Sequence, residues 1–328
     1  GAGIRAYDYM DGVGNRYGVH TVILEVDGEE VFRSVVDRFA YEENRYINSW
    51  THGQYMKSFI EPGNRLRMLH ASNGNRGLVE INEERPYRFV YTLSDALGNT
   101  SKVRFTVQGK NTEIHPVEHR EKYAFKWDRT NYLQEPGLEL VVPRGMLYDD
   151  VWLDYSVRAD SGDVAFTYQL HNKRVPLHGA CEMRIGLRRD RLEDKSKYYV
   201  AGVTARGGKY SIGGTYEDGF MKVRIRDLGT YTVAVDTVPP EIIPLNPGQW
   251  GRTGRITLKA KDKETGINSY RGTIDGKYAL FGKPNSISGN LVCELDPKHV
   301  KKGGRHTVEM TVTDGRGNRT TEEFHFVW

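Results

Sequence analysis

A short stretch near the middle of the chain matches a zinc-peptidase pattern. His115-Pro116-Val117-Glu118-His119 has the order H-x-x-E-H, in which two histidines bind zinc and the glutamate acts as general base. That chemistry requires both histidines on one face of a helix. Here a proline lies inside the motif, and the polar residues around it have no helical periodicity. We therefore interpret the stretch as a solvated linker and expect no metal ligand in it.

Two turns with the pattern D-x-x-G-N carry oxygen atoms that could contribute to a calcium loop. They lie at Asp95–Asn99 and Asp314–Asn318. Calcium takes about six to eight oxygen ligands, and each turn supplies only about two from side chains. We interpret both as hairpin turns, because Asp and Asn bond nearby backbone and Gly accepts a positive φ. The same interpretation covers four other acidic residues: Asp8, Asp11, Asp262 and Glu264.

The sequence contains no other recognisable catalytic motif. There is no G-x-S-x-G, no Walker loop and no complete dinucleotide fingerprint. Cys181 and Cys293 are the only cysteines, and neither has a nearby histidine in the sequence. We expect two buried free thiols. The chain is thus predicted to carry no catalytic residue, no metal ligand and no cofactor of its own.

Aromatic side chains are the best candidates for a binding surface. Their apolar faces can stack on sugars, although most aromatic residues of a β-sandwich belong to its core. Loops carry function more often than the elements that they connect. We therefore place the candidate ligand or partner surface in one long polar insertion, at four residues: Trp50, Tyr55, Tyr41 and Tyr46.

Composition excludes several classes of protein. Of the 328 residues, 27% are charged, and the two signs nearly balance at a net charge of +4. Nucleic-acid binding usually needs a concentrated basic face, so we expect no nucleic-acid partner. No apolar run approaches the roughly 18 residues of a transmembrane helix. Many Tyr, Val, Thr and Gly residues with little Ala favour strands over helices.

An internal repeat organises these strands. Tyr87–Asn99 and His306–Asn318 both alternate apolar and polar residues and both end in the D-x-x-G-N turn. The two Asp-Gly pairs, Asp27-Gly28 and Asp275-Gly276, are strong hairpin signals in matching places. The first and last parts of the chain are therefore predicted to be two copies of one β-sandwich module.

The predicted fold class is all-β, with three consecutive β-sandwich (immunoglobulin-like) domains of which the first and third are related. Residues 1–109 form the first sandwich, with an insertion at about 37–82. Residues 110–238 form a distinct β-sandwich domain, and residues 239–328 form the third sandwich. The prolines of Thr237–Pro240 predict a stiff, extended joint before the third domain. Within the insertion, Tyr41–Asn48 is expected to be a short helix or an irregular loop.

The middle domain is predicted to be rich in strands separated by turns. Turn residues cluster at 159–163 and 207–208. The expected strands are 138–142, 151–157, 164–170, 181–187, 198–204, 220–225 and 230–236.

Four segments of the first domain carry a family resemblance: Ile4–Gly12, Tyr17–Val19, Phe39–Ser49 and Ser58–Leu66. Together they resemble the non-catalytic C-terminal region of large bacterial cell-envelope proteins of the LytM/lysostaphin-type zinc metallopeptidase family. The resemblance covers most of residues 1–109 and, more loosely, the rest of the chain. The family's zinc-binding motifs, H-x-x-x-D and H-x-H, do not occur in this sequence, so no catalytic residue is carried over.

The resemblance implies an accessory role in the cell envelope, periplasmic or extracellular. A zinc metalloendopeptidase domain would lie upstream of Gly1, with zinc bound there, and this chain would position it or bind peptidoglycan, a glycan or an envelope protein. An alternative function is a stand-alone adhesin or carbohydrate-binding array. A third is a hydrolase whose site is assembled from residues of several domains.

Overall fold

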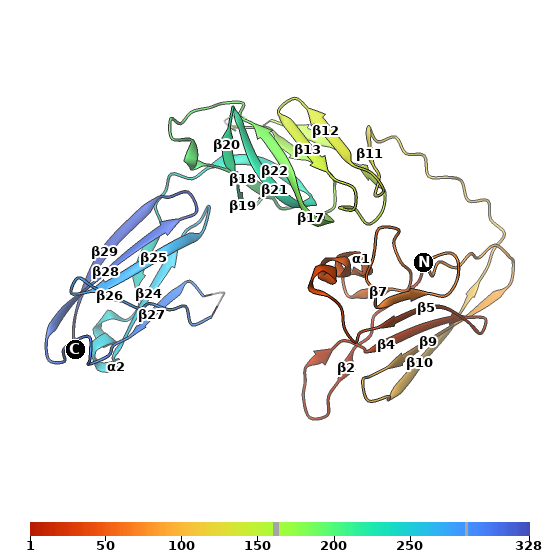
Figure 1. Cartoon of the computed structure of the whole chain (residues 1–328), viewed down its shortest axis with the longest axis horizontal. Helices are drawn as coiled ribbons and strands as arrows, with labels where there is room; N and C mark the ends of the chain where they lie inside the picture. The colour runs from red at the N-terminus through yellow and green to blue at the C-terminus, as the bar shows by residue number, and fades with distance from the viewer. Residues whose placement is uncertain (160–163, 286–287) are drawn as a thin grey trace.

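The computed structural model describes residues 1–159, 164–285 and 288–328 of the chain. Antiparallel strands gather around three separate hydrophobic cores, which confirms the predicted fold class of three consecutive β-sandwich domains. The three sandwiches follow one another along an arc, with the first and the third at its two ends (Figure 1). Within the described residues, no helix is long and apolar enough to cross a membrane.

The first sandwich has a main sheet in the order β10-β9-β4-β5-β8, a second sheet in the order β1-β7-β6, and a separate β2-β3 hairpin. Leu24, Phe89 and Tyr91 point into its core and are buried. Its strands are β1 Gly3–Ile4, β2 Asp8–Tyr9, β3 Arg16–Tyr17, β4 Thr21–Val26, β5 Glu29–Val35, β6 Thr51–His52, β7 Tyr55–Lys57, β8 Leu69–Ala71, β9 Pro86–Ser94 and β10 Thr100–Gln108.

Of the two alternatives expected for Tyr41–Asn48, a short helix and an irregular loop, the structure has the short helix. It consists of the 3-10 helix η1 (Tyr41–Tyr46) followed directly by α1 (Ile47–Trp50). The Glu43 carboxylate accepts a hydrogen bond from the Ala40 backbone N–H at the start of η1, which satisfies a donor that the helix leaves free. At the other end, the Thr51 hydroxyl donates to the Ile47 carbonyl.

The middle sandwich packs two five-stranded sheets, in the orders β12-β13-β17-β21-β20 and β15-β16-β22-β18-β19, with a β11-β14 pair beside them. Its strands are β11 Tyr123–Phe125, β12 Asn131–Glu135, β13 Leu138–Val142, β14 Val151–Leu153, β15 Ser156–Arg158, β16 Thr167–Gln169, β17 Val175–Gly186, β18 Tyr198–Val203, β19 Lys209–Gly213, β20 Thr215–Glu217, β21 Phe220–Leu228 and β22 Thr230–Val235, with the 3-10 helix η2 at Lys195–Lys197.

Several strands of the middle sandwich differ from the expected ones. Strand β17 begins at Val175, well before the expected start at Cys181, because its pairing with β21 continues through a register shift between Pro176 and Cys181. Strands β12, β19 and β20 are too polar or too short to have been predicted. Residues 160–163 of the expected turn at 159–163 lie outside the described residues.

The third sandwich has a sheet in the order β23-β24-β27 and another in the order β26-β25-β28-β29. Trp250 from a short helical segment closes the end of its core. Its elements are β23 Glu241–Pro244, η3 Pro247–Gln249, α2 Trp250–Thr253, β24 Arg255–Lys261, β25 Ile267–Ile274, β26 Lys277–Ala279, β27 Asn290–Glu294, β28 Arg305–Asp314 and β29 Arg319–Val327.

The two D-x-x-G-N turns have the same hydrogen bonds in the first and third sandwiches. The Asp95 carboxylate accepts from the Asn99 backbone N–H at 2.8 Å and from the Asn99 amide at 2.6 Å. The Asp314 carboxylate accepts from the Asn318 backbone N–H at 2.9 Å and from the Asn318 amide at 2.8 Å. This shared bonding supports the close relation of the two modules.

Candidate functional site

The four aromatic residues of the candidate surface lie in different environments. Trp50 is only 6% exposed, and its indole N–H donates to the Lys57 carbonyl at 3.0 Å. It belongs to the core of the first sandwich and offers no exposed ring face to a ligand. Tyr41 and Tyr55, by contrast, are exposed, so these two rings remain available on the surface of the insertion.

Tyr46 lies at the junction between the first and middle sandwiches. Its ring stacks on His178 with centroids 4.1 Å apart, and the Tyr148 ring meets both residues edge-on. Burial, with a smaller contribution from the Arg45 charge, lowers the pKa of His178. The imidazole is therefore neutral near pH 7.

Arg45 of the first sandwich and Tyr148 of the middle sandwich each donate hydrogen bonds to a carbonyl of the other domain. The Arg45 guanidinium donates twice to the Leu177 carbonyl, at 2.9 and 3.3 Å. In return, the Tyr148 hydroxyl donates to the Arg45 carbonyl at 2.6 Å. The amide of Asn64 donates to the Tyr46 carbonyl and to the Ser49 hydroxyl, which holds the helical segment in place for these contacts.

Gly63 brings the two backbones together at the same junction. Its N–H donates to the Tyr148 carbonyl at 2.7 Å. A Cβ at this position would lie 2.5 Å from the Leu147 carbonyl oxygen and 2.8 Å from the Tyr148 Cα. Since backbone cannot shift as a side chain can, only glycine permits this approach.

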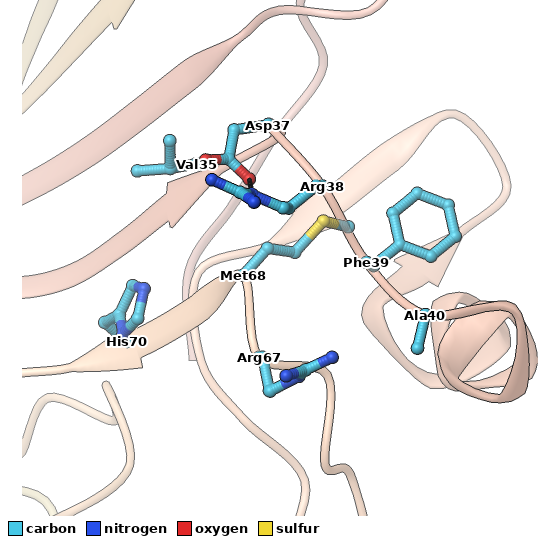
Figure 2. A pocket seen from close by; sticks show the side chains of 8 residues that line it. All are labelled: Val35, Asp37, Arg38, Phe39, Ala40, Arg67, Met68 and His70. Atoms are coloured by element: carbon cyan, nitrogen blue, oxygen red, sulfur yellow. Dashed lines mark ion pairs between the residues drawn. The ribbon is translucent and has the colours of Figure 1, made fainter.

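An open depression of about 790 Å³ adjoins the insertion, where β5 ends (Figure 2). Its basic side chains are already compensated. Arg38 lies 3.9 Å from the Asp37 carboxylate, and Arg67 pairs with Glu43. The depression therefore has little charge left for an anionic ligand, although Phe39 adds an exposed ring beside it.

The second junction joins the middle and third sandwiches through the D-x-x-G-N turn of β28 and β29. The Arg316 guanidinium donates to the Tyr198 and Gly214 carbonyls, both at 3.0 Å. The Asn318 amide donates to the Asp236 carbonyl at 3.0 Å. The equivalent turn of the first sandwich, Asp95–Asn99, is exposed and makes no such contact within the described residues.

Three carboxylates meet at this second junction. Among the residues that the structure describes, Asp236, Asp262 and Asp314 are the one group of acidic or histidine side chains spaced as metal ligands would be. Asp236 and Asp314 are 1% and 0% exposed. Sequence patterns paired Asp262 with its own turn and missed Asp236, which comes from the end of the middle sandwich.

Each of these carboxylates already accepts hydrogen bonds from the chain. Asp236 accepts from the Thr265 hydroxyl at 2.6 Å, and Asp262 accepts from three successive backbone N–H groups. Asp314 accepts from its own turn. Because calcium needs six to eight free oxygen ligands, this bonding favours a structural role in which the cluster anchors the joint.

The H-x-x-E-H stretch lies in an extended segment between β10 and β11, outside any helix. His119 stacks on Trp152 with ring centroids 3.6 Å apart, which fixes this end of the linker to the middle sandwich. The two histidines therefore do not share a helix face. Cys181 and Cys293 are both buried and free, and burial raises the pKa of each thiol to about 11.

Comparison with protein families identifies one segment of the chain. A model of the Zu5-like domain matches residues 122–236, which coincide with the strands of the middle sandwich from β11 to β22. A search of curated proteins returns no match.

Several solved structures align with most of the chain at low identity. A Ca²⁺-stabilised ice-binding adhesin of an Antarctic bacterium has 10% identity and a TM-score of 0.19, covering 94% of this chain and 89% of its own. A 1.5-MDa bacterial ice-binding adhesin has 9% identity and a TM-score of 0.16, covering 95% and 87%. The mixed-linkage glucan-binding SGBP-B of Bacteroides ovatus has 12% identity and a TM-score of 0.16, covering 93% and 59%.

Replacing Gly63 with alanine is expected to separate the first and middle sandwiches. The new Cβ would collide with the backbone at Leu147 and Tyr148, while each hydrophobic core stays intact. Small-angle X-ray scattering should therefore show a larger radius of gyration with an unchanged circular dichroism spectrum. Gly74→Ala in the same insertion is the matched control, since a Cβ there meets nothing within 4 Å. An unchanged scattering curve for Gly63→Ala would contradict the claim that the close approach at Gly63 holds the two sandwiches together.

The repeat supplies a matched pair of variants for the second junction. Asn318→Ala and Asn99→Ala both remove an amide bond to the aspartate of their own turn. Only Asn318→Ala also removes the bond to Asp236, worth on the order of 1 kcal/mol. Hydrogen exchange of the backbone amides of residues 236–238 should rise in Asn318→Ala and stay at the wild-type level in Asn99→Ala. Equal exchange in the two variants would count against a fixed second junction.

The carboxylate cluster predicts a pH dependence of stability. Burial raises the pKa of Asp236 above its usual value of 3.8, and the charges of Asp262 and Asp314 raise it further. Hydrogen bonds from Thr265 and Val238 oppose this by lowering the pKa. The folded chain thus holds this proton more tightly than the unfolded chain does. The protonated carboxyl stabilises the fold at low pH, and this contribution is lost as the pH rises through the raised pKa.

The neutral variant Asp236→Asn is therefore expected to melt about 2 °C above the wild type at pH 7, and the difference should vanish near pH 4. Differential scanning calorimetry measures both values. Asp11→Asn, at an exposed position, is the control and should not change the profile. A lower melting temperature for Asp236→Asn at pH 7 would refute this account, as would a calcium-dependent rise in that of the wild type.

Proposed function

We propose that the chain is a non-catalytic β-sandwich binding array of the cell envelope or cell surface, which holds its three domains at fixed angles. The observation that supports this most is the construction of its two junctions. Domains of one chain are expected to move relative to one another unless their interface prevents it. Here each junction is a set of direct hydrogen bonds between domains, each contributing on the order of 1 kcal/mol.

The path of the chain supports the same conclusion. Residues 109–121 form a long extended connection that runs outside the contact between the first two sandwiches (Figure 1). Such a connection alone would leave the first sandwich free to rotate. The insertion supplies the junction instead, so its sequence serves to fix an orientation that the linker does not provide.

An accessory role beside a LytM/lysostaphin-type peptidase domain is a second proposal. Two segments that carry the resemblance, 39–49 and 58–66, supply Arg45, Tyr46 and Gly63 to the first junction. In that role the array would present an upstream zinc peptidase to its cross-linked substrate at a set distance. The binding function of this chain would then serve to retain the enzyme at the wall.

Co-sedimentation with insoluble cell-wall material tests the proposal. The chain should sediment with peptidoglycan or with an insoluble polysaccharide, bind no stoichiometric zinc and release no soluble muropeptides. Bovine serum albumin sedimented in parallel measures trapping. Release of muropeptides would contradict a non-catalytic array, and failure to sediment with any of these materials would reduce the chain to a spacer.

A further inference from the structure

A second concave surface lies on the middle sandwich, and its lining includes none of the residues that form the two junctions. It is a groove of about 570 Å³ on the sheet that contains β15, β16, β22 and β18. In this sheet Tyr168 and Tyr231 point inward and are buried in the core. Their neighbours along the strands point to the opposite, outer face, since side chains alternate in a strand. The groove lies on that outer face.

Strand register brings a row of polar side chains together across the floor of the groove. Ser156 pairs with Gln169, and Arg158 pairs with Thr167. Gln169 in turn pairs with Thr230 of the next strand. Cross-strand partners of this kind lie on the same face at about 5 Å. The floor is therefore a continuous band of hydroxyl and amide groups with one guanidinium at its edge.

The polar groups of the floor have unused hydrogen-bonding capacity. Thr167 is only 5% exposed, yet its hydroxyl has no hydrogen-bond partner among the described residues. The Gln169 amide donates to the Asp154 carbonyl at 3.0 Å, which orients the side chain and leaves its oxygen to accept. The Thr167 hydroxyl is not among the buried unsatisfied atoms of the described residues, so it is open to solvent and free to donate to a ligand in the groove or accept from it.

The charged residues that line the groove are all basic. Its lining contains no acidic residue and includes Arg158, Lys173 and Arg174. Arg174 is held by the Asp227 carboxylate at 2.6 Å. Arg158 and Lys173 are exposed and form no ion pair within the described part of the chain. This distinguishes the groove from the depression of Figure 2, whose arginines are paired.

Two further side chains complete the rim. The exposed ring of Tyr210 lies directly against Gly202. A Cβ at position 202 would come within 2.3 Å of this ring, so the ring can pack there only because residue 202 is glycine. His171 accepts from the Asp154 N–H through Nδ1, which leaves Nε2 as a donor. An aromatic face beside neutral donors and acceptors is the usual lining of a sugar-binding site.

We propose that this groove binds an acidic polysaccharide, with sugar hydroxyls on the Thr167–Gln169–Thr230 floor and carboxylates at Arg158 and Lys173. Guanidinium and ammonium groups without partners are complementary to carboxylates, and the hydroxyl and amide floor is complementary to neutral sugar hydroxyls. An acidic peptide would match the charges but not the floor. The assignment rests on the proposed function as a binding array and names its ligand class.

Isothermal titration calorimetry of the full chain with oligogalacturonate tests this assignment. The wild type should bind the carboxylate form and bind its methyl ester at least about tenfold more weakly, because esterification removes the charges. Arg158→Gln combined with Lys173→Gln should weaken binding of the carboxylate form by about tenfold or more. Tyr210→Ala should weaken both forms, since it removes the stacking face.

The control variant removes the same charge elsewhere. Lys102→Gln combined with Arg104→Gln changes two exposed residues of β10 in the first sandwich and should leave the affinity unchanged. Equal loss in the two double variants would mean a general charge effect and would overturn the groove assignment. Polyglutamate binding as tightly as oligogalacturonate would overturn the sugar assignment.

The calorimetric test of the groove and the sedimentation test of the proposed function can fail independently. If oligogalacturonate does not bind but the wild type and the Arg158→Gln/Lys173→Gln variant sediment equally with cell-wall material, the groove inference is wrong and the binding array stands. If neither assay detects binding, both are wrong. Melting temperatures of all variants should equal that of the wild type, because the substituted side chains are exposed.

Discussion

Backbone carbonyls at the two ends of the middle sandwich need donors, and the neighbouring domains supply them. Leu177 and Tyr148 accept from the first sandwich, and Tyr198 and Gly214 accept from Arg316 of the third. Carbonyl groups at domain ends are the ones that sheet pairing leaves unsatisfied. The orientation of all three domains follows from how these groups are paired, because each donor is fixed by its own domain.

One turn sequence serves two purposes in the related modules. In the first sandwich the Asp95–Asn99 turn closes a hairpin and faces solvent, whereas Asp314–Asn318 closes the same hairpin and is buried against Asp236. The local bonding is identical, so hairpin formation does not depend on the neighbour. Two of the interdomain hydrogen bonds come from Arg316, at the position where the first module has the exposed Leu97.

Sequence patterns were sufficient for what depends on local periodicity. Alternation and turn residues predicted the three-sandwich fold class and the repeat, but they left Tyr41–Asn48 open between a short helix and an irregular loop. They could not predict that Trp50 is buried, since a tryptophan in a polar insertion has no alternating neighbours to indicate its direction. They also could not pair Arg45 with Leu177, because contacts across more than a hundred residues have no sequence period.

The polar groove was invisible in the sequence for a related reason. Its residues come from five strands and three connecting segments, and each looks like an ordinary solvent-facing position of a sandwich. What distinguishes it is the combination of a polar floor with two exposed cations, Arg158 and Lys173, that form no ion pair within the described part of the chain. A fixed array gives such a groove a constant direction relative to its neighbours. A long polymer could therefore lie along the middle domain without first ordering the protein, and this reduces the entropic cost of binding.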